Sequence, residues 1–186
     1  YNDPRLKSYF NPAQDGRDKD GNINKEVAGV KQLSSIEDEY KGVRQGTGVA
    51  DNRYSTHSQT TITTASKIIV MSAAEVWFLR AEAALRYNTG DDVENCYKQG
   101  VTVSFAQWDA NGVSDYLESD NIPAAYVDVF DAKFNADAPS TITPKWDNTA
   151  DKEEKLERII TQKWLALYPE GCEAWAEQRR TGYPRL

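Results

Sequence analysis

The feature that most constrains the fold is a change of residue pattern at Ser72. Before it, residues 1–66 are rich in Gly, Asn, Asp, Ser and Thr, which are typical of turns and irregular connections. From Ser72 the sequence reads SAAEVWFLRAEAALRYNTG, where apolar residues recur at the three- and four-residue spacing of an amphipathic helix. We therefore expect one domain or partial domain over 1–186, with a loop-rich region over 1–66 and a helical region over 67–186.

The first predicted helix has recognisable start and stop signals. Ser72 is placed to cap it, and Glu75 three positions later completes a capping box. Asn88 or Gly90 can end it. The positions expected to face the core are the apolar ones at 73, 76, 77, 81, 84 and 85.

A second helix is predicted directly after the first. Asp91 is its expected cap, with Glu94 in the first turn, and its apolar positions continue to Trp108. Gly100 is costly inside a helix and marks a point where another helix must approach closely. Two helices joined by a short turn form an antiparallel hairpin. The pair resembles a tetratricopeptide unit, which needs neighbouring helices to bury its faces.

Further helices are predicted over 113–118, 124–133, 151–168 and 170–180, and short extended pieces over 60–64 and 67–70. Asp151 is expected to cap the long helix, and Gly182 to end the last one. The predicted apolar face of the long helix is Leu156, Ile159, Ile160, Trp164 and Leu167. The predicted fold class is mostly α, with tetratricopeptide-like helix pairs, a long loop-rich N-terminal region and few short strands.

Composition excludes several classes of function. The net charge of -7, with basic residues scattered among acids, argues against nucleic-acid binding, which needs a concentrated positive face. The sequence has no run long and apolar enough to span a membrane. Cys96 and Cys172 lie in helical patterns, which favours two buried free thiols, with one disulfide as the alternative.

Loop aromatics provide the candidate binding residues. Sugar rings stack their C–H faces on aromatic side chains, and their hydroxyl groups need polar partners. The run YKGVRQGTGVADNRYSTH supplies both kinds of side chain, and a second loop supplies a tryptophan. The predicted ligand-binding residues are Tyr40, Arg44, Asn52, Tyr54, His57 and Trp146. The alternative interpretation is a solvated loop whose tyrosines pack against the domain.

A weaker signal is the run QDGRDKDGNIN. Asp18, Asp20 and Asn22 alternate in it and offer oxygen ligands suited to calcium. Gly21 is not where an EF-hand loop requires it, so an exposed acidic turn is the alternative. His57 is the only histidine, which forms neither an ordinary zinc site nor a triad by itself. Apart from this possible calcium, we predict no cofactor.

The C-terminal run EGCEAWAEQRRTGYPRL is predicted to form a structural corner. Glu173, Glu177 and Arg180 are spaced for ion pairs on one helix, and Trp175 can stack on Trp164 across the break between two helices. Direct ligand contact is the alternative. The helical residues Trp77 and Trp164 are expected in the core.

Taken together, DPRL followed by YF, then MSAAEVWFLRAEAALR, then LERIITQKWLALYPEGCEAWAEQRRTGYPRL closely resemble the SusD/RagB family, in its SusD-like branch. The resemblance implies a surface-exposed outer-membrane lipoprotein that binds oligosaccharides, or sometimes peptides, without catalysis. It implies a SusC-type TonB-dependent transporter as partner and contact with the membrane only through a lipid anchor outside this chain. It also implies that these residues are an internal piece from the C-terminal half of a longer protein.

Two other functional classes stay open at this point. A tetratricopeptide-type scaffold would bind only protein partners. A glycosidase would need two carboxylates flanking a sugar, but no spacing among the 29 acidic residues singles out a pair.

Overall fold

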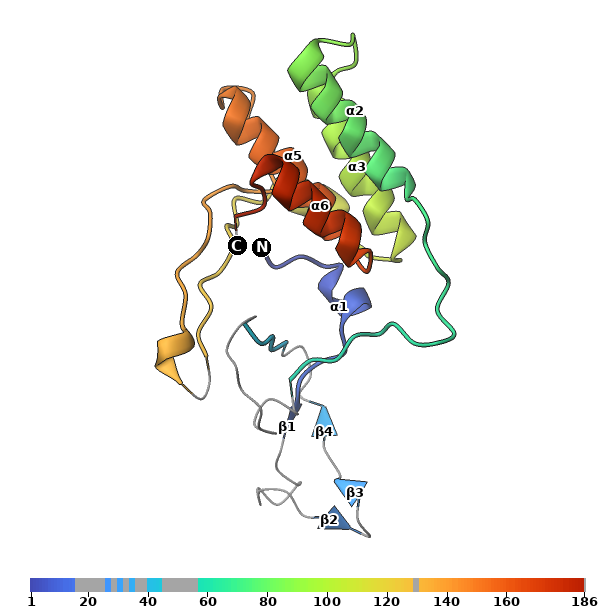
Figure 1. Ribbon diagram of the computed structural model, residues 1–186, viewed down its shortest axis with the longest axis vertical. Coiled ribbons are helices and arrows are strands. Elements are labelled where there is room, and N and C mark those ends of the chain that lie inside the picture. The colour runs from blue at the N-terminus through green and yellow to red at the C-terminus, as the bar shows by residue number, and fades with distance from the viewer. Residues whose placement is uncertain are drawn as a thin grey trace.

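The computed structural model describes residues 1–15, 26–27, 30–31, 34–35, 40–44, 57–128 and 131–185. This part of the chain is mostly helical, as predicted, and the helices gather in one body (Figure 1). The α-helices are α1 (Leu6–Tyr9), α2 (Ala73–Tyr87), α3 (Val93–Gln107), α4 (Val113–Leu117), α5 (Lys152–Ala166) and α6 (Gly171–Thr181), with a 3₁₀ turn η2 (Ala132–Phe134).

Four two-residue strands form two antiparallel pairs. β1 (Gln14–Asp15) pairs with β4 (Ser34–Ser35), and β2 (Glu26–Val27) pairs with β3 (Val30–Lys31). The register aligns Gln14 with Ser35 and Glu26 with Lys31. The prediction of few short strands is confirmed for the described residues.

Helices α2 and α3 form the predicted hairpin, with one correction at the turn. The Ser72 hydroxyl accepts a hydrogen bond from the Glu75 amide at 3.1 Å, and Asn88 ends α2 in the left-handed conformation with φ 53°. The cap of α3 is Asp92, which accepts from the Asn95 amide, and not Asp91. Asp91 instead forms a two-pronged ion pair with Arg80 of α2, at 2.6 and 3.0 Å, which removes it from the capping position.

Gly100 marks the close contact between these two helices, as its position in the sequence predicts. A Cβ atom at Gly100 would lie 2.8 Å from Cε1 and Cζ of Phe78, which is fully buried on α2. Any larger side chain must therefore displace an aromatic ring in the core.

We expect Gly100→Val to lower the free energy of unfolding by about 1–3 kcal/mol, because the added methyl groups overpack the α2–α3 contact. Gly171→Val is the matched control, since a Cβ there meets nothing within 4 Å. Urea denaturation followed by far-ultraviolet circular dichroism measures both variants. Equal stability of the two variants would contradict the close approach of Phe78 to Gly100.

Helix α5 runs through the centre of the helical body and packs against α2, α3 and α6. The predicted apolar residues Leu156, Ile159 and Ile160 are buried. So are polar side chains on its other faces, at Glu157, Arg158, Thr161, Gln162 and Lys163. An amphipathic pattern does not reveal this all-round burial, because several of the partners of these polar groups lie far away in the sequence, such as Arg5 and Tyr116 for Gln162. Trp164 is only half-buried, which corrects its expected place in the core, and Trp77 is half-buried as well.

The buried face of α2 differs from the predicted one. Ala74, Phe78 and Ala81 face the core, whereas Val76 is 42% exposed. Glu75 and Glu82 are also buried, although nothing in the apolar pattern marks them. Ala81 and Ala84 are buried as predicted, and the two buried glutamates lie beside cations of α5 and α6, with Lys163 3.9 Å from Glu75 and Arg180 2.6 Å from Glu82.

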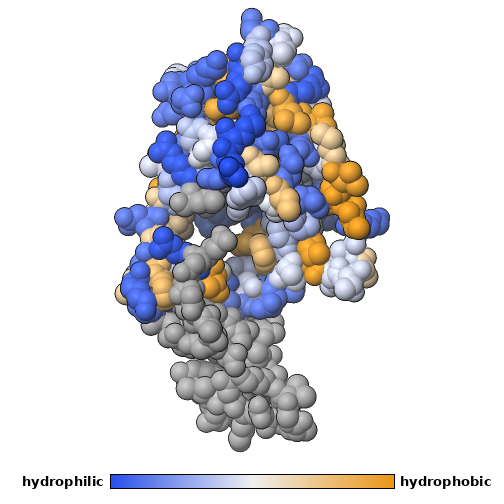
Figure 2. All heavy atoms as spheres, viewed as in Figure 1, coloured by the Kyte–Doolittle hydropathy of each residue, from blue (hydrophilic) through white to orange (hydrophobic). Residues whose placement is uncertain are grey.

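Three predicted elements are wrong. Of the helix expected over 124–133, the described residues show only the 3₁₀ turn η2 at its end, and Tyr126 makes an isolated bridge with Ala136. The pieces over 60–64 and 67–70 are not strands, although Thr60 makes an isolated bridge with Phe10. Ile68 and Val70 are 90% and 93% exposed, and Figure 2 shows apolar side chains scattered among hydrophilic ones on the helical part.

The cysteine prediction is half right. Both thiols are free, but only Cys96 is buried, and Cys172 near the start of α6 is exposed. No helix in the described part of the chain is long and apolar enough to cross a bilayer.

Arg5, from the DPRL motif, is a hub that joins the N-terminal segment to the helices. Its side chain is fully buried and forms a two-pronged ion pair with Asp3, at 2.6 and 3.0 Å. It also donates to Ser104 Oγ of α3 at 2.8 Å and to Gln162 Oε1 of α5 at 2.9 Å. Burial opposes the charge of Arg5, but the hydrogen bonds to Asp3 outweigh it and raise the pKa of the guanidinium.

Helix α6 is held by an ion-pair network, which confirms the predicted pairing of Glu177 with Arg180. The other two parts of the predicted corner, an ion pair of Glu173 and stacking of Trp175 on Trp164, are not found among the described residues. Arg180 donates to both oxygens of Glu82 on α2, at 2.7 and 2.6 Å, and to Glu177 at 2.6 Å. Glu177 also lies 3.0 Å from the buried Lys163 Nζ of α5. We call Glu82, Lys163, Glu177 and Arg180 the α6 network. Trp175 lies outside it and is 60% exposed, with the Arg179 guanidinium 4.8 Å from its ring centroid.

Two glutamates of α2 should give opposite pH dependences of stability. Burial opposes ionisation of Glu82, but hydrogen bonds from Arg180 and Arg86 outweigh it, so its pKa lies below the ordinary value. Its contribution is therefore present above the unfolded-state pKa and lost as the pH falls through the folded-state pKa. Burial raises the pKa of Glu75, Lys163 partly offsets this, and Glu173 and Glu177 add to it.

We therefore expect Glu82→Gln to be less stable than the parent chain at pH 7, with the difference shrinking as the pH falls below about 4. For Glu75→Gln the trend should be opposite: its free energy of unfolding should increase relative to that of the parent chain as the pH rises from about 4 to 7. Urea denaturation across this pH range measures both differences. If the stability difference from the parent chain changed with pH in the same direction in both variants, the opposite pKa shifts of Glu82 and Glu75 would be contradicted.

Candidate functional site

Two loops distant in sequence meet around the predicted binding residues. The Tyr126 hydroxyl lies 3.5 Å from the Gly42 carbonyl oxygen and donates to Asp128 Oδ2 at 2.9 Å. Arg44 donates from Nη1 to the Phe134 carbonyl oxygen at 3.4 Å. We call residues 40–44, 57–58 and 126–136, as far as they are described, the loop site. The segment 40–44 and the 126–136 loop therefore form one surface.

His57 lies at the buried edge of the loop site. The next residue, Ser58, pairs with the backbone of Lys41, its amide donating to the Lys41 oxygen at 2.9 Å and its hydroxyl accepting from the Lys41 amide at 3.0 Å. Burial and the nearby Lys41 ammonium lower the pKa of His57, and the Asp128 carboxylate partly offsets them. The imidazole is therefore neutral at pH 7 and able both to donate and to accept a hydrogen bond.

Hydrogen bonds join the two described parts of the 126–136 loop, 126–128 and 131–136. Tyr126 and Ala136 exchange backbone hydrogen bonds at 2.8 and 3.0 Å, which closes the loop. Asp128 is buried, its amide donates to Asn135 Oδ1 at 2.8 Å, and its Oδ1 accepts from the Asp131 amide at 2.9 Å. The exposed Arg44 guanidinium therefore contacts a loop whose described parts are hydrogen-bonded to each other.

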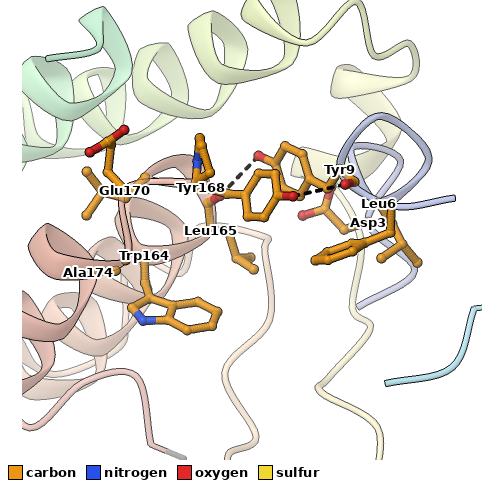
Figure 3. A pocket seen from close by; sticks show the side chains of 12 residues that line it. Asp3, Leu6, Tyr9, Trp164, Leu165, Tyr168, Glu170 and Ala174 are labelled. Carbon is orange, nitrogen blue, oxygen red and sulfur yellow. Dashed lines mark hydrogen bonds between the residues drawn. The ribbon is translucent and has the colours of Figure 1, made fainter. Parts of the chain in front are cut away.

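A separate, apolar cavity lies between α1 and the corner that joins α5 to α6. It has a volume of about 230 Å³ and is lined in part by Leu6, Phe10, Trp164, Leu165 and Tyr168. Figure 3 shows side chains of this lining converging from the two sides.

Aromatic contacts organise the wall of this cavity. The rings of Tyr9 and Tyr168 stack with centroids 4.5 Å apart, and Phe10 lies 5.2 Å from Tyr168. Tyr9 donates to the Leu165 carbonyl oxygen at 3.0 Å and Tyr168 to the Tyr9 carbonyl oxygen at 3.1 Å. The hydroxyl groups of these two tyrosines are thus used within the fold.

Comparison with protein families identifies the chain. A family model described as SusD-like, "Susd and RagB outer membrane lipoprotein", matches residues 1–186. The chain belongs to the SusD-like family. The SusD-like match covers every residue of the chain.

Solved SusD-like structures agree with this membership and with the helical, tetratricopeptide-like fold. A SusD homologue from Bacteroides vulgatus is 41% identical with a TM-score of 0.80, and the match covers 100% of this chain and 36% of that one. One from Bacteroides uniformis is 40% identical with a TM-score of 0.82, covering 100% and 35%. A chitin-binding SusD homologue from Flavobacterium johnsoniae is 38% identical with a TM-score of 0.79, covering 99% and 35%.

The chain thus spans little more than a third of the length of these SusD-like relatives. Among curated proteins, none matches it.

The structure brings together three of the predicted ligand residues of this SusD-like chain. Tyr40, Arg44 and His57 all lie in the loop site, with Tyr40 half-buried, Arg44 exposed and His57 buried. Asn52 and Tyr54 lie outside the described residues, so their roles stay predictions. The same holds for the calcium ligands, Asp18, Asp20 and Asn22.

Trp146 lies elsewhere, in the hydrophobic core. It is 8% exposed, its ring centroid is 5.1 Å from that of Tyr97, and its indole N–H donates to Asn148 Oδ1 at 3.0 Å. These contacts give it a packing role. Its ligand contact stays a prediction from the sequence, and the proposed site below does not include it.

Sequence reasoning missed Tyr126 and Asp128 as members of the loop site. Both fall in the stretch 124–133, whose apolar residues favour a helix. The signal that could have found them is the run YVDVF, whose alternation of polar and apolar residues is typical of extended chain. Their proximity to Arg44 depends on tertiary structure and has no local signature.

Proposed function

We propose that this chain contributes to capture of an oligosaccharide without chemical change, and that the loop site is where the sugar binds. Membership of the SusD-like family carries the proposal, and the solved relative from Flavobacterium johnsoniae is described as chitin-binding. The loop site supports it because it combines an aromatic residue, Tyr40, with hydrogen-bonding groups on Arg44 and His57.

The chemistry of the loop site suits neutral, hydroxyl-rich ligands. Arg44 offers donors, the hydroxyl oxygen of Tyr126 and the carboxylate of Asp128 offer acceptors, and the neutral imidazole of His57 carries one donor and one acceptor. Polar groups held rigidly before binding lose less conformational entropy when the ligand arrives. Asn52 and Tyr54 remain part of the proposed site as sequence predictions.

We further propose that the captured oligosaccharide passes to a SusC-type TonB-dependent transporter at the outer membrane. The family description as outer membrane lipoproteins supports this location. The transporter contact and the lipid anchor are proposed for the whole protein, since the relatives are much longer than this chain. No catalytic step is required, because capture and transfer involve no bond cleavage.

Calorimetric titration with a panel of oligosaccharides that includes chito-oligosaccharides tests the proposal. We expect one class to bind, and Arg44→Ala and Tyr126→Phe each to weaken binding about tenfold, which corresponds to about 1.4 kcal/mol. Arg179→Ala, an exposed arginine on α6, is the matched control and should leave affinity unchanged. Cleavage of any sugar, or binding that is equally strong in all three variants, would refute the proposed site.

A further inference from the structure

Arg44 is a charged group of the loop site that the described fold leaves without a counter-charge. Its side chain is exposed, and its long hydrogen bond to the Phe134 carbonyl oxygen, at 3.4 Å, uses only one of the N–H donors that a guanidinium offers. Among the described residues, no carboxylate forms an ion pair with Arg44. Its positive charge is therefore available to a ligand.

The two acidic residues in the described part of the loop site have other partners. Asp128 is buried, and its two carboxylate oxygens accept from the Asp131 amide and from the Tyr126 hydroxyl, each at 2.9 Å. The Asp131 carboxylate lies 2.7 Å from Lys133 Nζ and also accepts from the Lys133 amide at 3.1 Å. Neither carboxylate is paired with Arg44.

The described part of the loop site is positively charged on balance. Its basic residues outnumber its acidic ones, with Lys41, Arg44 and Lys133 against Asp128 and Asp131. The chain as a whole has the opposite sign, with a net charge of -7. A locally positive surface on an acidic protein favours a ligand with a negative charge, because complementary charge steers that ligand to the site and disfavours others.

A carboxylate on the sugar would supply the partner that Arg44 lacks. The hydroxyl groups of a neutral sugar can use the donors and acceptors of the loop site, but they leave the charge of Arg44 unpaired. The guanidinium is planar and presents its N–H donors as a fork, which matches the two coplanar oxygens of a carboxylate. Hydrogen bonds between such charged groups are roughly twice as strong as those between neutral groups.

We propose that the oligosaccharide captured at the loop site carries a uronic-acid unit, whose carboxylate pairs with the Arg44 guanidinium. Hydroxyl groups of the same unit and of its neighbours then bind Tyr126 and His57. The inference rests on the proposed function, because it names the class of sugar that binds at the same site. It adds a requirement for charge at one position of an otherwise neutral, hydroxyl-rich ligand.

Calorimetric titration with matched pairs of oligosaccharides tests the requirement for charge. The pairs are an oligogalacturonide and its methyl ester, a hyaluronan oligosaccharide and its methyl ester, and a xylo-oligosaccharide with and without a glucuronic-acid branch. We expect the acidic member of at least one pair to bind about tenfold more tightly than its neutral counterpart, or better. Raising the salt concentration from about 50 to about 500 mM should reduce this ratio, because salt screens exposed charges.

Variants of Arg44 separate its charge from its hydrogen bonding. Arg44→Gln keeps an amide donor without the charge, so it should bind the two members of that pair with nearly equal affinity. Arg44→Lys keeps the charge and should retain a preference for the acidic member. Arg179→Gln is the matched control, because Arg179 is also exposed but lies on α6 beside the ring of Trp175, and it should keep the full ratio. Unchanged circular dichroism spectra would show that the variants are folded.

Three results would overturn the proposal. One is that in every pair the neutral member binds as tightly as the acidic member, and another is that Arg44→Gln keeps the ratio of the parent chain. The third is a sulfated oligosaccharide without uronic acid that binds more tightly than every uronate. A neutral sugar that binds the loop site with no preference for charge would refute this inference and leave the proposed capture standing, whereas no binding by any sugar would refute both.

Discussion

Arg5→Ala should lower the free energy of unfolding by about 3–5 kcal/mol, the range for removing one partner of a buried ion pair. The loss has two physical sources. Asp3 keeps its charge, with only 13% of its side chain exposed and its cation gone. Ser104 and Gln162 lose a donor, and the vacated volume lies beside the rings of Phe105 and Tyr116, whose centroids are 4.9 and 5.5 Å from the guanidinium carbon.

The measurement is urea denaturation followed by circular dichroism, with Arg44→Ala as the matched control. Arg44 is exposed and its hydrogen bond to the Phe134 carbonyl oxygen is long, so its loss should change stability by no more than about 0.5 kcal/mol. Arg5→Lys should recover only part of the loss, because an ammonium cannot reproduce the planar two-pronged contact with Asp3. An Arg5→Ala variant as stable as Arg44→Ala would show that the N-terminal segment is not anchored as described.

Lys163→Met should lower the free energy of unfolding by a similar amount, about 3–5 kcal/mol, because it removes a buried cation from the α6 network. Lys163 is 1% exposed and lies 3.0 Å from Glu177 and 3.9 Å from Glu75. Methionine fills much of the same volume, so the change isolates the charge. Glu75 would then have no cation of the network beside it, and Glu177 would depend on Arg180 alone within the network.

Lys98→Met is the control for this prediction. Lys98 also pairs with a glutamate, Glu94, at 2.7 Å, but both side chains are about one-third exposed. Pairs of this kind one turn apart on a helix surface contribute about 0.3–0.5 kcal/mol. If denaturation gave Lys163→Met and Lys98→Met the same stability, the buried position of Lys163 and the α6 network would have to be abandoned.

The sequence predicts the ends of the helices well where capping residues mark them. Ser72, Asn88, Asp151 and Gly182 cap helices as expected, because capping depends on residues within a few positions. Gly100 even indicates a tertiary contact, since close approach of another helix explains a glycine there.

What the sequence does not predict is burial of charge. Arg5, Glu82 and Lys163 have the character of surface residues in any hydropathy pattern, and they are buried because partners up to 157 positions away neutralise them or accept their hydrogen bonds. The same limit applies to the loop site. Residue type alone indicates Tyr40, Arg44 and His57, whereas Tyr126 and Asp128 join them only through the fold. Trp146 shows the converse, a loop tryptophan that packs inward.

The most direct test of the central claim is to map an oligosaccharide onto the chain by NMR. We predict that the sugar class that binds in calorimetry shifts the backbone resonances of 40–44, 57–58 and 126–136, and leaves the Trp164 indole unchanged. Shifts confined to the apolar cavity between α1 and the α5–α6 corner, or to α6, with the loop-site resonances unmoved, would contradict it.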